Sequence, residues 1–273
     1  MPLQALEPKR LYQQIAGQLR ALMEAGEFAV GKRLPAERDL AVQLNVSRPS
    51  VREALIALEV EGWVEIRSGS GVYVLTNTAP TISTKAAYDE WGPLELIAAR
   101  GLMEGEVAAL AAQHASKEAI VHMTGALAAM RLALQEGKDP LPGDELFHKA
   151  IAQACGNEVL LDTVSRYWHA RRSPLYLRLA DYFEGPASWR SVLAEHGAVL
   201  KAIKNRNPVA AREAMQQHMA KALARFSAGW HLANPAAQEP PAIKVKISSM
   251  KVEVVKASSQ PTRRHHVRQT FTA

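Results

Sequence analysis

The sequence predicts a mainly α-helical protein, with a small N-terminal domain of helices and one β-hairpin followed by an all-α helical bundle. The 273 residues exceed the length of a typical single domain. Apolar residues recur with a period near 3.6 along most of the chain, and one short segment shows period two. We expect a first domain over 1–78, a linker over 79–93, a helical domain over 94–232 and a basic disordered tail over 233–273.

Three helices are expected at the start of the chain. Over 11–25, apolar residues at steps of three and four predict a helix with one buried face: Leu11, Ile15, Leu19 and Leu22. A short helix is expected from about Ala36, a turn at Asn45, and another helix opened by Ser47 as N-cap. Their inward positions are expected to be Leu40, Leu44, Val51, Leu55 and Leu58.

A β-hairpin is expected directly after these helices. Residues 63–67 alternate between apolar and polar, Ser-Gly-Ser-Gly at 68–71 favours a turn, and 72–75 continue as a β-branched and aromatic strand. Two helices joined by a tight turn and followed by a hairpin make a winged helix-turn-helix.

The rest of the chain predicts five or six helices. Amphipathic stretches over 94–232 are separated by GKDPLPGD, EGPAS and NRNP, and Asn207 followed by Pro208 is a good helix start. In the tail, the alternating residues 243–255 favour one additional strand.

Charge and cysteine content limit the classes of function. The net charge is +6, but residues 233–273 hold seven basic and two acidic residues, while 1–78 hold nine of each. DNA binding in the first domain would therefore depend on where charges lie and not on their sum. Cys155, the only cysteine, excludes an internal disulfide and a four-thiolate metal site. With no signal peptide or membrane-spanning run, we expect a cytoplasmic protein without a membrane partner.

The helix opened by Ser47 carries the groups that suit DNA recognition. The N-terminal part of the second helix of a helix-turn-helix enters the major groove, where arginine can bind guanine with two hydrogen bonds. The run LPAERDLAVQLNVSRPSVREALIALEVEGWVEIRSGSGVYV strongly resembles the winged helix-turn-helix of GntR-family regulators. That resemblance implies DNA contacts by Arg38, Ser47, Arg48, Ser50, Arg52, Ser68 and Gly69. The alternative is that the arginines form surface ion pairs with Glu37, Glu53 and Glu59.

Four residues of the second domain form a candidate metal-binding set. Asp144 and His148 are four residues apart on one expected helix, so they share a face. His196 and His218 lie on two further helices, and one carboxylate with three neutral imidazoles suits a divalent transition metal. Taken alone, each histidine is more often an ordinary core or surface residue. Zinc is the expected ion, with nickel and manganese as alternatives.

Residues 94–229 resemble the FCD sensor domain of the FadR subfamily. Its metal-binding members show D-x-x-x-H, a histidine roughly fifty residues later and another about twenty later; the intervals here are 4, 48 and 22. The resemblance implies that these four residues bind a metal and that Arg100 receives an anionic effector. Alternatively, Arg100 and Glu104 form only a helix salt bridge. The stretch WHARRSPLYLRL offers further groups for a sugar or carboxylate, or else a basic outer face: Trp168, His169, Arg171, Arg172 and Tyr176.

These expectations combine into a transcription regulator and not an enzyme. It would be a repressor that binds an inverted-repeat operator as a homodimer, because one short recognition helix reads too few base pairs. Its effector would be a small carboxylate, and the chain looks most similar to regulators of hexuronate use. The alternatives are a metal-dependent hydrolase, for which no separate general base is evident, and an architectural nucleic-acid binder that acts through the tail.

Overall fold

The computed structural model describes residues 10–78 and 91–228. All of them lie in residues 1–237, the first of the two units into which the chain divides. The expected tail, its strand and most of the expected linker lie outside the described residues. Mainly α-helical structure with one small hairpin is confirmed.

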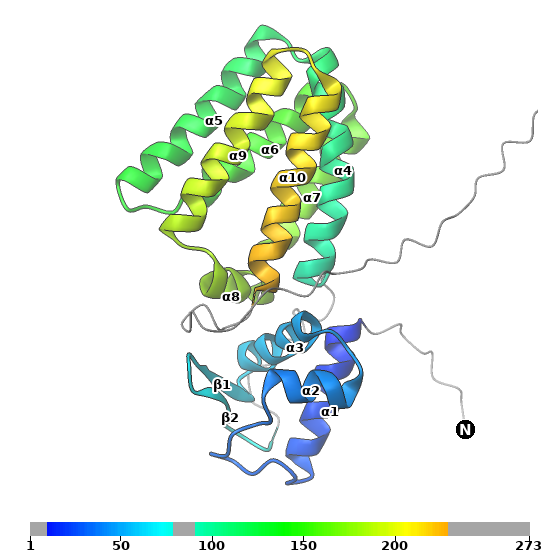
Figure 1. The fold of residues 1–273 in the computed structure, drawn as a ribbon, viewed down its shortest axis with the longest axis vertical. Helices are drawn as coiled ribbons and strands as arrows, with labels where there is room; N and C mark the ends of the chain where they lie inside the picture. The colour runs from blue at the N-terminus through cyan, green and yellow to red at the C-terminus, as the bar shows by residue number, and fades with distance from the viewer. Residues whose placement is uncertain (1–9, 79–90, 229–273) are drawn as a thin grey trace, which may run out of the picture. The chain divides into compact units, whose positions relative to one another are not determined.

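The N-terminal domain contains three helices and a two-stranded antiparallel sheet (Figure 1). The elements are α1 (Leu11–Glu24), α2 (Glu37–Leu44), α3 (Arg48–Val60), β1 (Val64–Arg67) and β2 (Gly71–Val74). Ser47 caps α3 as expected, since its hydroxyl accepts a hydrogen bond from the Ser50 amide at 3.2 Å. Asn45 ends α2 in the left-handed conformation, which allows the tight turn between the two helices.

Two details of this domain differ from the sequence expectation. Leu11 and Leu22 are 45% and 40% exposed, because the buried face of α1 is centred on Ile15 and Leu19 and completed by Tyr12, Ala16 and Met23. The hairpin also gains a third segment, since the Leu34 amide donates to the Val72 carbonyl at 2.8 Å. This segment precedes α2 and has no period-two pattern that would reveal it.

Seven helices make up the described part of the second domain, where five or six were expected. They are α4 (Pro93–His114), α5 (Lys117–Gln135), α6 (Leu141–Ala154), α7 (Glu158–Ala170), α8 (Pro174–Phe183), α9 (Pro186–Lys204) and α10 (Pro208–Ser227). The additional helix arises where the chain turns at Arg171–Ser173 and Ser173 caps α8, with its hydroxyl accepting from the Tyr176 amide at 3.1 Å. Asn207 caps α10 as expected.

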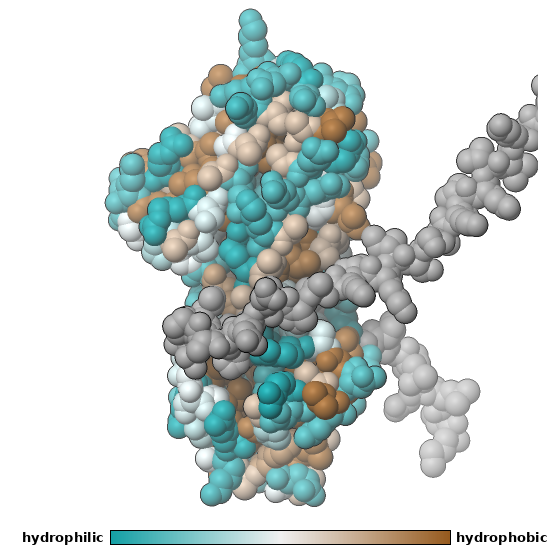
Figure 2. Space-filling view, in the orientation of Figure 1, coloured by the Kyte–Doolittle hydropathy of each residue, from teal (hydrophilic) through white to brown (hydrophobic). Residues whose placement is uncertain are grey.

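The bundle packs α10 against both α4 and α9, and α6 against α5 (Figure 1). Gly143 permits a close approach at the start of α6, because a Cβ there would lie 2.6 Å from Cγ of Met130 on α5. Asp144 follows this glycine directly, so the contact sets its depth in the bundle. On the face drawn in Figure 2, apolar residues form scattered patches among hydrophilic ones. No described helix has the length and apolarity needed to cross a membrane.

Candidate metal centre and DNA-binding surface

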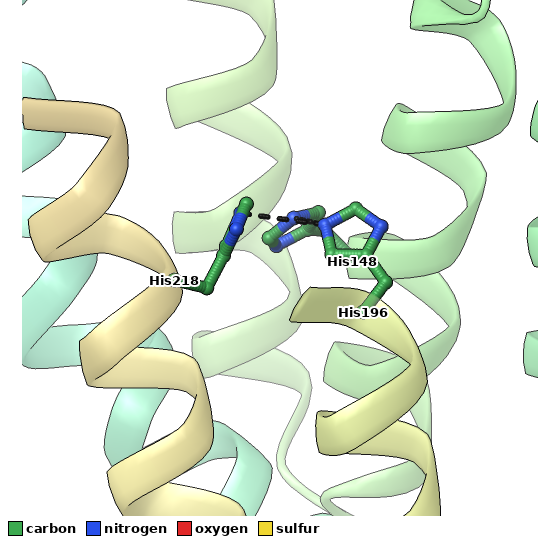
Figure 3. Close-up of side chains that lie close together, drawn as sticks. All are labelled: His148, His196 and His218. Carbon is green, nitrogen blue, oxygen red and sulfur yellow. Dashed lines mark hydrogen bonds between the residues drawn. The ribbon is translucent and has the colours of Figure 1, made fainter. Parts of the chain in front are cut away.

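Three helices bring the imidazoles of His148, His196 and His218 to one point inside the bundle (Figure 3). The Nε2 atom of His196 lies 3.2 Å from Nε2 of His148 and 3.3 Å from Nε2 of His218. All three side chains are buried. Two nitrogens bound to one zinc ion at about 2.1 Å and a near-tetrahedral angle lie roughly 3.4 Å apart. The separations therefore fit three nitrogen ligands of a single ion.

Asp144 completes this set from the same helix face as His148. Its Oδ1 lies 3.4 Å from Nε2 of His196 and 3.6 Å from Nε2 of His148. Within the described residues, Oδ1 is buried and accepts no hydrogen bond, although the other oxygen, Oδ2, accepts from Arg171 at 2.8 Å. A buried carboxylate oxygen without a donor is costly, and a cation among the imidazoles would satisfy it.

The ionisation of these groups suits metal binding. Burial, together with the neighbouring imidazoles, holds the pKa values of His196 and His218 well below the ordinary histidine value, so both rings are neutral near pH 7. Burial alone would raise the pKa of Asp144, but the Arg171 guanidinium and the three imidazoles together outweigh it and lower that pKa. A neutral imidazole and an ionised carboxylate are the ligand forms of these side chains.

Two buried glutamates orient the imidazoles from behind. Nδ1 of His218 lies 2.7 Å from Oε2 of Glu195, and Nδ1 of His148 contacts Oε2 of Glu104. Donation from Nδ1 to a carboxylate leaves Nε2 unprotonated and free to coordinate. The sequence does not reveal either role: Glu195 lies on α9 and acts on α10, and Glu104 on α4 acts on α6. Because each glutamate and its histidine lie on different helices, no characteristic spacing in the sequence links them.

Arg100 lies at the edge of this centre with only 2% of its surface exposed. Its Nε donates to Oε1 of Glu104 at 2.7 Å, so the expected salt bridge is present. The same glutamate contacts His148, and the guanidinium carbon of Arg100 lies 4.6 Å from the Trp168 ring. Both interpretations of Arg100 are therefore compatible with its position.

The predicted DNA-contact residues fall into two groups. Arg38, Ser68 and Gly69 are exposed, with Arg38 at the start of α2 and the others in the hairpin turn. Ser47 and Ser50 hydrogen-bond each other at 2.8 Å at the start of α3, and 38% of the Arg48 side chain is exposed. These six residues are accessible or lie at the start of the second helix, as DNA contacts require.

Arg52 does not present its guanidinium to solvent, in contrast with the sequence expectation. It is 2% exposed, and two of its nitrogens donate to Glu37 at 2.7 and 2.9 Å. Glu37 also accepts from Nε of Arg48 at 3.0 Å. The alternative that these arginines form ion pairs thus applies to Arg52, which joins α2 to α3 in this conformation. The sequence allowed both arrangements, because its pattern does not show whether the Arg52 side chain faces solvent or Glu37.

Family models match both domains. Residues 11–74 match the model described as bacterial regulatory proteins, gntR family, and residues 95–221 match the FCD domain. The Exu regulon transcriptional regulator of Escherichia coli is 36% identical over 225 residues, covering 78% of this chain and 83% of that protein.

The chain belongs to the GntR family of bacterial regulatory proteins. Another relative of this GntR-family regulator is the Uxu operon transcriptional regulator of Escherichia coli, 37% identical over 221 residues, with 79% of this chain and 86% of that protein covered. A solved structure of Streptococcus agalactiae GntR is 25% identical and superposes with a TM-score of 0.41 over 78% of this chain and 99% of that one. Membership of this family makes the chain a DNA-binding transcription regulator and not an enzyme, and neither the family models nor these two Escherichia coli relatives support the hydrolase alternative.

Proposed function

We propose that this GntR-family protein is a repressor whose operator binding is controlled by a small carboxylate effector bound beside a divalent metal. Asp144, His148, His196 and His218 would hold the metal. The main support for this metal site is that three Nε2 atoms and a carboxylate oxygen without a partner among the described residues converge inside the bundle. Zinc is the proposed ion because three imidazoles and one carboxylate are ligands it accepts, and nickel or manganese are alternatives.

The charge balance supports an anionic effector. Arg100 and Arg171 are buried beside the centre. Arg100 pairs with Glu104, whereas Arg171 pairs with Asp144 at 2.8 Å and with Glu184 at 3.5 Å. When all are ionised, these two arginines and three carboxylates sum to a charge of −1, so a divalent ion would still leave a net positive charge in a buried site. A carboxylate reaching the metal and Arg100 would offset part of that charge. The resemblance to the Exu and Uxu regulators favours a hexuronate as this acid.

The proposed DNA-recognition surface consists of the start of α3 and the hairpin turn. Arg38, Ser47, Arg48, Ser50, Ser68 and Gly69 would contact DNA directly. Arg52 would contribute by fixing α2 to α3 unless DNA draws it out of the pair with Glu37. Because one such surface covers few base pairs, the active form would be a homodimer on an inverted repeat. Light scattering and a footprint on operator DNA test this: a monomer that protects a single half-site would contradict it.

Thermal unfolding of the metal-loaded chain tests the sensor half of the proposal. D-Glucuronate, D-galacturonate, lactate and an acyl derivative would each be added at increasing concentration to loaded and chelator-stripped protein. A specific ligand stabilises the folded state by mass action, so a hexuronate should raise Tm of the loaded protein only. An equal rise in Tm of the stripped protein would contradict the proposed role of the metal. If none of the acids changed Tm, the proposed carboxylate effector would be wrong.

A further inference from the structure

We propose that Trp168 and Arg171 bind the hydroxyl-bearing part of the effector, so that the site selects a hydroxylated acid over a plain carboxylate. This inference rests on the proposed function and adds the basis of its specificity. Arg100 and the metal would then hold the carboxylate end. Trp168 and Arg171 would read the oxygens that distinguish a sugar acid from other small acids.

Both residues adjoin the candidate metal centre. They lie three positions apart at the C-terminal end of α7, which places them on one helix face. Trp168 is 1% exposed and its ring centroid lies 5.2 Å from that of His148. Arg171 is 5% exposed and its guanidinium donates to Oδ2 of Asp144 at 2.8 Å. Each therefore touches one of the four proposed ligands.

Each of the two side chains carries a buried donor without an acceptor. In the described part of the chain, four buried side-chain atoms lack a hydrogen-bond partner, and all four belong to this cluster: Asp144 Oδ1, His196 Nδ1, Trp168 Nε1 and Arg171 Nε. Buried polar groups in native proteins are almost always paired, so their concentration here marks a binding site. A metal ion can satisfy the carboxylate oxygen. It cannot satisfy the N–H groups of Trp168 and Arg171, which require acceptor oxygens from a ligand.

The geometry of these donors distinguishes them from Arg100. Both terminal nitrogens of Arg171 already donate to carboxylates, to Asp144 at 2.8 Å and to Glu184 at 3.5 Å, and Nε is its one buried nitrogen without an acceptor among the described residues. Trp168 likewise offers one N–H. Arg100 bonds only through Nε to a described residue, so its two terminal nitrogens remain for a carboxylate. Single donors suit hydroxyl or carbonyl oxygens, whereas a guanidinium fork suits a carboxylate.

The Trp168 indole also lies against both guanidinium groups. The central carbon of Arg171 is 4.4 Å from the ring centroid and that of Arg100 is 4.6 Å away. The ring therefore fixes the distance between the proposed carboxylate-binding cation and the proposed hydroxyl-binding donors. A ligand that engages both needs a carboxylate and further oxygens on one compact skeleton, as a hexuronate has.

Titration calorimetry on the metal-loaded full chain tests the inference with Trp168→Phe. Phenylalanine keeps an aromatic ring beside the arginines and removes only the unpaired N–H. The probes would be D-glucuronate and D-galacturonate, compared with cyclohexanecarboxylate, which has a six-membered ring and a carboxylate but no hydroxyls. Trp91→Phe is the matched control, because Trp91 is 39% exposed and packs against Tyr167 outside the centre.

We expect Trp168→Phe to weaken binding of the preferred hexuronate about fivefold to thirtyfold, as loss of one or two hydrogen bonds would, and to change cyclohexanecarboxylate binding by less than about twofold. Metal content and the Tm of unliganded protein should not fall, since the deleted donor has no partner. Arg171→Lys, which keeps the cation near Asp144 and loses the Nε donor, should show the same selectivity. Unchanged hexuronate affinity in Trp168→Phe, or an equal loss for both acids, overturns the inference. Wild-type protein that binds none of the acids overturns the proposed function itself.

Discussion

Nδ1 of His218 lies 2.7 Å from Oε2 of Glu195, and this one contact fixes which nitrogen of the imidazole faces the other two histidines. The same glutamate accepts from Arg225 at 3.2 Å, so the pair is anchored from the far side as well. The orientation of the proposed metal ligand thus depends on a residue that would not touch the metal.

Glu195→Gln should reduce metal affinity by roughly tenfold to a hundredfold, the usual effect of losing a carboxylate behind a ligating histidine. A chelating dye competed against the protein measures this loss. Glu106→Gln is the matched control, since Glu106 pairs α4 with α10 through Arg212 at 2.6 Å but is exposed. Equal metal affinity in the two variants would mean that Glu195 does not orient the ligand.

Arg100→Lys should keep the metal and lose effector binding. Lysine preserves a positive charge beside Glu104 but lacks the planar fork that binds a carboxylate with two hydrogen bonds. We expect a loss of about tenfold or more in hexuronate affinity, measured by calorimetry, with an unchanged metal content by elemental analysis. If affinity persists, Arg100 serves only as the helix salt bridge that the sequence also allows.

Arg48 and Arg52 should respond differently to truncation. Arg48→Ala should cost about 1 to 3 kcal/mol of operator binding with little effect on folding, because it is the accessible residue proposed to read a base. Arg52→Ala should instead destabilise the N-terminal domain by about 3 to 5 kcal/mol, since it leaves Glu37 buried without its strongest partner. Operator titrations and thermal unfolding separate the two effects. Normal stability of Arg52→Ala with abolished operator binding would return Arg52 to the DNA-contact set.

Stability should depend on pH through Glu53. Burial raises the pKa of this carboxyl to about 7, against an opposing hydrogen bond from the Leu94 amide. A raised pKa stabilises the folded state fully below the unfolded value near 4.5, and this contribution disappears as pH rises through 7. Glu53→Gln should therefore raise the free energy of unfolding by about 2 to 3 kcal/mol at pH 8.5 and by little at pH 4.5. The exposed Glu24→Gln is the control; a Glu53→Gln effect independent of pH would refute the assignment.

Features that depend only on residues close together in the sequence were predicted well. The α3 cap at Ser47, the hairpin and the Asp144–His148 spacing all follow from local patterns. Contacts between segments were harder to predict from the sequence. Whether Arg52 faces DNA or Glu37, for example, depends on how α2 packs on α3. The break between α7 and α8 was missed because the connecting segment, Arg171–Ser173, is too short to stand out as a loop in the sequence. Glu104 and Glu195 were missed as orienting groups because their histidine partners lie on other helices.

Calorimetric titration of one hexuronate into metal-loaded and chelator-stripped protein tests whether effector binding depends on the metal. We expect one effector to bind per sensor domain in the loaded protein and no measurable binding after stripping, with binding restored when the metal is returned. Circular dichroism of the stripped protein shows whether the helices persist, so that loss of binding can be separated from unfolding. Undiminished hexuronate binding by folded, metal-free protein would contradict the proposed role of Asp144, His148, His196 and His218.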